Sequence, residues 1–150
     1  MHDRQETSAE NLQDTILKNK VVKMLNDRAI SPTQQRVKIG MVLFTEDQHL
    51  SADQVLDMVN TKGNFASKAT VYNTLGLFAR KGLIREVIVD STKVFYDSNI
   101  RPHHHFYNID SGTLHDVEAD QLHISSLPTP PDAAEVKDVS VIIRIQHKNQ

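Results

Sequence analysis

The sequence predicts an α+β protein, with an N-terminal winged helix-turn-helix domain followed by a small α/β dimerisation domain that has a three-stranded antiparallel sheet. Apolar residues recur at helical spacing in the first 80 residues and alternate at strand spacing afterwards. Charge divides similarly: residues 1–85 hold 12 basic and 9 acidic residues (net +3), and residues 86–150 hold 5 and 10 (net −5). We therefore expect a winged-helix domain over 1–98 and a second domain over 99–150.

Four helices are expected before residue 83. Their starts and ends are marked by turn and capping residues: Ser31-Pro32-Thr33, the capping box Ser51-Ala52-Asp53-Gln54, Gly63-Asn64, Ser67 and Lys81-Gly82. The first helix is expected over residues 12–28. The buried faces are predicted from apolar residues at three- and four-residue steps: Leu17, Val21 and Met24; Val37, Met41 and Phe44; Val55, Met58 and Val59; Val71, Leu75 and Phe78.

The chain after residue 83 has the pattern of strands. A hairpin over 84–96, turning at 90–93, follows the helices, and that order is the winged-helix layout. Further strands are expected over 103–109, 113–117 and 137–146. Because so small a sheet buries little apolar surface, the second domain is expected to dimerise.

Several classes of protein are excluded by composition. The chain has no cysteine, which removes disulfides, thiol nucleophiles and cysteine-ligated zinc. Enzymatic activity is not expected, because the chain lacks the G-x-S-x-G and H-E-x-x-H motifs and any glycine-rich phosphate loop. A cytoplasmic protein without a membrane partner is expected, since no apolar run approaches the roughly 20 residues of a membrane span and the first residues are too polar for a secretory signal.

The outer face of the fourth helix suits DNA. A tyrosine and an asparagine there can contact a thymine methyl group and base edges, while basic and hydroxyl side chains can reach phosphates. An ordinary solvated helix face is the alternative interpretation. The candidate DNA contacts are Arg36, Ser67, Lys68, Thr70, Tyr72, Asn73 and Arg80.

Three consecutive histidines, His103, His104 and His105, predict a metal site. If they lie in a strand, His103 and His105 share one face and His104 takes the other. The next strand adds Asp116, and imidazole together with carboxylate suits Zn²⁺, Fe²⁺ or Mn²⁺, while neutral imidazole also suits haem iron. A polar surface strand is the alternative.

Three segments in this chain form a recognisable set: PTQQR at 32–36, SKATVYNTL at 67–75 followed by KGLI at 81–84, and HHHFYNIDSG at 103–112. Together they resemble the ferric uptake regulator (Fur) family over roughly residues 14–146. The triplet Tyr72-Asn73-Thr74, the three histidines, the absent cysteines and the short proline-bearing connector are most similar to its iron response regulator branch.

The resemblance implies two sets of ligands. The interdomain metal site would use His49, a hinge acid that is Asp97 or its neighbour Tyr96, then His103, His105 and Asp116. A second metal or haem site would use His104 and His123. The structural zinc of other members should be missing, because Asn108 and Ser111 stand where they have cysteines.

The resulting hypothesis is a homodimeric transcriptional repressor or activator of iron homeostasis. It would bind an A/T-rich inverted repeat in double-stranded DNA and respond to iron, manganese, zinc or haem. The alternative is a metal- or haem-buffering protein in which the winged helix is only a scaffold.

Overall fold

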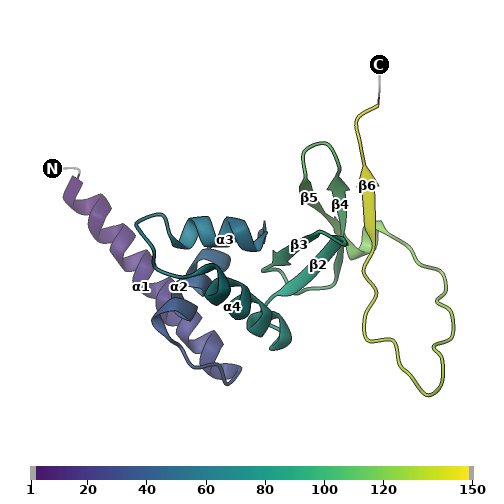
Figure 1. The fold of residues 1–150 in the computed structure, drawn as a ribbon, viewed down its shortest axis with the longest axis horizontal. Coiled ribbons are helices and arrows are strands. Elements are labelled where there is room, and N and C mark those ends of the chain that lie inside the picture. Colours follow the sequence, from purple (N-terminus) through teal and green to yellow (C-terminus); the bar gives the residue numbers. More distant parts are fainter. Residues whose placement is uncertain (1–2, 149–150) are drawn as a thin grey trace. The chain divides into compact units, whose positions relative to one another are not determined.

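The structure, a computed structural model, describes residues 3–148 and divides into two compact units, Met1–Ile100 and Arg101–Gln150 (Figure 1). The first unit contains the α-helices, and the second contains a small sheet. Within the described range, no helix is both long enough and apolar enough to cross a bilayer.

Four helices form the body of the first unit: α1 (Asp3–Asp27), α2 (Gln34–Leu43), α3 (Ala52–Val59) and α4 (Lys68–Arg80). The predicted caps are present at the starts of the last three. The Thr33, Ser51 and Ser67 hydroxyls each accept a backbone N–H three residues later, and Gln54 completes the capping box of α3. Gly82 closes α4 in the left-handed region, with φ at +75°. α1 starts earlier than residue 12, because residues 3–11 contain no proline or glycine and favour helix.

The apolar core of the first unit is drawn from all four helices. The fully buried side chains that the helices contribute to it are Val21, Leu25, Ile39, Leu43, Val55, Val59, Val71, Leu75 and Phe78. The predicted buried faces were partly wrong: Leu17 and Met24 of α1 and Met41 and Phe44 of α2 are only partly buried, and Met58 of α3 is 41% exposed. In α2, Val37 is buried as predicted, and Ile39 and Leu43 are buried in place of Met41 and Phe44, because two stripes of α2 are apolar and spacing alone does not say which one meets the core.

The predicted hairpin forms from β2 (Arg85–Asp90) and β3 (Lys93–Asp97), which pair antiparallel. A further strand, β1 (His49–Leu50), pairs with β3 on its other edge, so the sheet order is β1-β3-β2. The sequence did not predict β1, because a strand of two residues has no alternation to detect.

The second unit consists of β4 (His103–Asn108), β5 (Thr113–Glu118), a 3₁₀ turn η1 (Ala119–Gln121) and β6 (Ile142–Ile145), with β4 in the centre of the sheet. The expected antiparallel three-stranded sheet was wrong in one strand: β5 pairs antiparallel with β4, but β6 pairs parallel to it. The physical reason is the long connector after η1, visible as the loop before β6 in Figure 1, which lets the chain return to the starting end of β4. No α-helix occurs between residues 103 and 148, so the α/β description of this domain was also wrong.

Candidate functional site

Strand alternation sorts the three histidines of β4 as predicted. His105 lies directly opposite Asp116 of β5 in the antiparallel register. The Nε2 atoms of His103 and His105 lie 3.4 and 3.5 Å from the same carboxylate oxygen, Oδ1 of Asp116. One ligand atom from each of these three residues lies within 4.8 Å of the others, which is a spacing that one metal ion can bridge.

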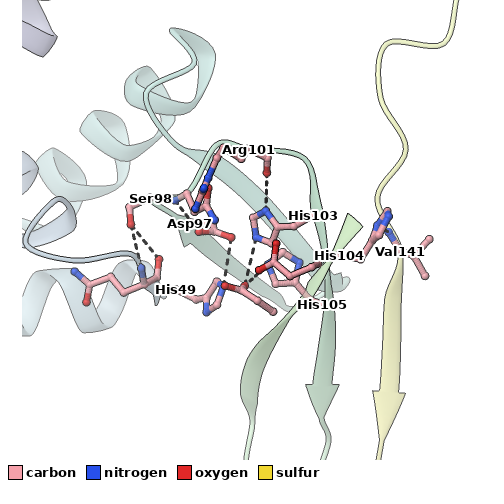
Figure 2. A network of polar contacts seen from close by, with 12 residues as sticks. His49, Asp97, Ser98, Arg101, His103, His104, His105 and Val141 are labelled. Carbon is pink, nitrogen blue, oxygen red and sulfur yellow. Dashed lines mark hydrogen bonds and ion pairs between the residues drawn. The ribbon is translucent and has the colours of Figure 1, made fainter. Parts of the chain in front are cut away.

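The contact of His103 with Arg101 determines whether the other ring nitrogen, Nε2, faces Asp116 as a donor or as an acceptor. Its Nδ1 lies 2.6 Å from the Arg101 carbonyl oxygen, which can only accept, so Nδ1 carries a proton (Figure 2). In the neutral imidazole, Nε2 therefore presents its lone pair to Asp116. Two lone pairs facing each other at 3.4 Å repel, and a cation between them turns this repulsion into attraction. The donor set thus fits Zn²⁺, Fe²⁺ or Mn²⁺.

The first unit holds a second pair of ligand residues. Pairing of β1 with β3 places His49 opposite Asp97, and His49 Nε2 lies 3.3 Å from Asp97 Oδ2. The side chain of Asp97 is 1% exposed, and its other oxygen accepts the Asn99 backbone N–H at 2.9 Å. Of the two hinge candidates, Asp97 therefore lies with His49, whereas Tyr96 packs into the core opposite Leu50.

His104 and His123 lie elsewhere. The buried His104 accepts the Val141 backbone N–H on Nδ1 at 3.0 Å (Figure 2). This hydrogen bond joins β4 to the residue that directly precedes β6. The proton of His104 is then on Nε2. His123 is exposed beyond η1, and among the residues that the structure describes, neither histidine belongs to a cluster of three or more candidate ligands.

The outward face of α4 carries the predicted DNA-contacting residues. Val71, Leu75 and Phe78 are buried, while Tyr72 is 41% exposed. Lys68 and Tyr72 are four residues apart and Asn73 and Arg80 are seven apart, and these exposed side chains together form the outward stripe of α4.

The remaining predicted DNA contacts have structural partners as well. Ser67 caps α4, accepting the Thr70 backbone N–H and donating to its hydroxyl. Arg36 is partly buried and donates to the Ser31 carbonyl oxygen at 3.1 Å. These residues shape the surface around α4 whether or not they touch DNA.

The model of the ferric uptake regulator family matches residues 27–143, which is most of the chain. The chain belongs to the ferric uptake regulator family. Members of this family are metal-responsive transcription regulators that bind DNA and form dimers, and they are not enzymes.

Individual Fur-family relatives are distant. A ferric uptake regulation protein of Synechococcus elongatus is 29% identical over 102 residues, covering 65% of this chain and 69% of the relative. The peroxide-responsive repressor PerR of Staphylococcus epidermidis is 28% identical over 98 residues, covering 65% of each chain. The ferric uptake regulator of Pseudomonas aeruginosa, solved with manganese, superposes with a TM-score of 0.65 at 20% identity, over 86% of this chain and 98% of that one. The curated matches thus span about two thirds of those proteins.

One residue next to the outward stripe of α4 was missed. Asp53 of α3 accepts a hydrogen bond from the Tyr72 hydroxyl, at 3.1 Å. The sequence indicated Asp53 only as part of a capping box. Its contact with α4 depends on how two helices pack, and no local pattern records that.

Proposed function

We propose that this Fur-family chain is a homodimeric, sequence-specific DNA-binding regulator of iron homeostasis whose DNA affinity is set by a bound metal ion. The observation that carries the proposal is the convergence of His103 and His105 on Asp116, in a family of metal-responsive regulators. Residues 1–98 would bind DNA, and residues 99–150 would bind the ligand and the second copy.

The family resemblance implies a metal site that would take ligands from both units. His49 and Asp97 would supply two ligands, and His103, His105 and Asp116 would supply three. Five nitrogen and oxygen donors suit one divalent ion of iron, manganese or zinc better than either set alone. An ion held in this way would favour one arrangement of the two units. Since the ligand favours one arrangement over others, it would shift DNA affinity.

The proposed DNA surface is the outward stripe of α4. Tyr72 and Asn73 would contact base edges in the major groove, with Arg36, Lys68 and Arg80 nearer to phosphate. Ser67 and Thr70 would place the start of α4 against the DNA backbone. A homodimer is matched by an A/T-rich inverted repeat, because each copy then meets an equivalent half-site.

We propose further that the chain belongs to the iron response branch of the family and that haem is one of its ligands. Haem or a second ion would bind through His104 and His123. Ligation through Nε2 of His104 moves its proton to Nδ1, which can then no longer accept the Val141 N–H. Binding at His104 would therefore release the start of β6, and the parallel pairing of β6 with β4 is the readout for that ligand.

DNA titrations test the function as a whole. The full chain is titrated against a fragment from upstream of its own gene that contains an A/T-rich inverted repeat, and against a scrambled fragment. Each titration is repeated without metal and with Fe²⁺, Mn²⁺, Zn²⁺ or haem. We expect a preference for the repeat, and a ligand-dependent change of about 5- to 150-fold in the dissociation constant.

Two variants assign the effects to residues. Tyr72→Ala is expected to lower specific affinity by about 1 to 3 kcal/mol if the ring reads a base. Replacing His103 and His105 by alanine is expected to remove the metal response but to leave metal-free DNA binding, whereas the exposed His115→Ala serves as control. Metal binding without any preference for the repeat would instead support the buffering function.

A further inference from the structure

Asp53 places a negative charge beside the DNA-facing stripe of α4. Its Oδ1 accepts the Tyr72 hydroxyl at 3.1 Å and lies 3.9 Å from Lys68 Nζ. That same Nζ lies 5.6 Å from the centroid of the Tyr72 ring. A carboxylate, an ammonium group and a phenol are thus joined on the surface of the first unit.

A carboxylate at this position weakens binding to phosphate. It repels the DNA backbone, and it partly neutralises Lys68, the basic residue in the first turn of α4. A surface optimised only for affinity would have a neutral or basic side chain here. The geometry therefore indicates that Asp53 contributes something other than affinity.

Its other contact is with the Tyr72 hydroxyl. An exposed tyrosine has freedom about both side-chain torsions, and a hydrogen bond to a neighbouring helix limits that freedom. A ring held in one orientation before binding loses less entropy when it meets a base. Asp53 lies in the first turn of α3, whose capping box fixes the backbone that carries the carboxylate.

We propose that Asp53 is a positioning residue that determines DNA specificity: it orients the Tyr72 ring and limits non-specific phosphate binding by Lys68. The inference rests on the proposed DNA-binding function. It adds a residue of α3 to a surface otherwise built from α4.

Two substitutions separate the two effects. Asp53→Asn removes the charge but keeps a carbonyl oxygen that can accept the Tyr72 hydroxyl. Asp53→Ala removes both. Tyr72→Phe removes the hydroxyl without altering α3, so it tests the hydrogen bond independently of any effect on the cap. Asp57→Asn, which neutralises another exposed acid of α3, is the matched charge control.

Each variant is titrated against the repeat and the scrambled fragment over a range of salt concentrations. For Asp53→Asn we expect both fragments to bind about two- to fivefold more tightly, the range for an exposed ion pair, with an unchanged ratio of the two affinities. The slope of log K against log salt should steepen by about one, as for one added phosphate contact.

Asp53→Ala should bind scrambled DNA as tightly as Asp53→Asn does, but its preference for the repeat should fall about two- to tenfold, the range for one hydrogen bond. Tyr72→Phe should lose the same preference, and the double variant Asp53→Ala/Tyr72→Phe should lose no more than either single variant. Asp57→Asn should leave the ratio unchanged. Circular dichroism melting confirms that each variant is folded.

The outcomes separate the two levels of the proposal. If the parent prefers the repeat but Asp53→Ala and Tyr72→Phe retain its full preference, the role of Asp53 is overturned and the proposed function stands. If the parent itself does not distinguish repeat from scrambled DNA, both are overturned.

Discussion

The two units of this chain are stabilised differently. In the first unit, four helices and the wing surround an apolar core with many fully buried side chains, among them Phe78 and Leu75. In the second unit, the apolar residues buried within the described range are only Tyr107, Leu114 and Val117, beside the three buried histidines. The first unit therefore depends on apolar burial, whereas the second depends on how its imidazoles are paired.

This difference has a consequence for ligand binding. Burying polar groups is unfavourable unless they find partners, and a metal ion that binds only the folded sheet adds its binding free energy to folding. A metal ion bound at His103, His105 and Asp116 should therefore stabilise the second unit. The proposed second copy would act in the same direction by covering the exposed apolar residues of this unit, such as Leu127.

Removing a core side chain should give the largest effect on stability, and the loss should differ between the two units. Phe78→Ala is expected to lower the free energy of unfolding by about 3 to 5 kcal/mol, because a fully buried ring leaves a cavity. Leu114→Ala of β5 should cost less, near the lower end of the range of about 2 to 5 kcal/mol for such changes, because the sheet has few apolar neighbours to lose. Urea denaturation measures both, and equal losses would refute the contrast.

Metal should give the next largest effect on stability, and that effect should depend on the histidines of β4. At Mn²⁺ or Zn²⁺ concentrations a hundredfold above the dissociation constant, the gain in stability is expected to be about 2.7 kcal/mol. Calorimetry with and without metal measures it. The gain should vanish when His103 and His105 are both replaced by alanine, and it should persist in His115→Ala. An undiminished gain in the double variant would place the ion elsewhere.

The same difference explains what the sequence could predict. Helix starts and the outward face of α4 could be predicted because capping residues and helical spacing are local features of the sequence. Ser67 caps α4, and Tyr72 is exposed on its outward face. Strand alternation likewise separated His104 from its neighbours. These predictions need only the chain's own periodicity.

Contacts between distant segments were not predictable in this way. The parallel pairing of β6, the short strand β1 and the contact of Asp53 with Tyr72 depend on packing between segments far apart in sequence. The choice between Tyr96 and Asp97 depended on the β1 register, which places Asp97 opposite His49. A register shift of one residue would place Tyr96 opposite His49 instead.

The smallest expected effect on stability concerns Tyr96, which is buried in the apolar core of the first unit. Burial raises the pKa of its phenol above the ordinary value of 10.0, and the nearby Glu86 and Tyr72 raise it further. The folded chain thus keeps the Tyr96 proton at a pH where the unfolded chain has lost it. Stability is complete below pH 10 and falls as pH rises from there through the folded pKa, by at most about 1.4 kcal/mol per pH unit for one group.

Tyr96→Phe removes the ionisable hydroxyl but keeps the buried ring. Urea denaturation between pH 9 and 11 should show a shallower loss of stability in this variant than in the parent chain. Both proteins are measured without metal, because the neighbouring Asp97 is a proposed metal ligand. An equal loss in the two proteins over this pH range would mean that Tyr96 does not hold its proton more tightly in the folded chain than in the unfolded chain.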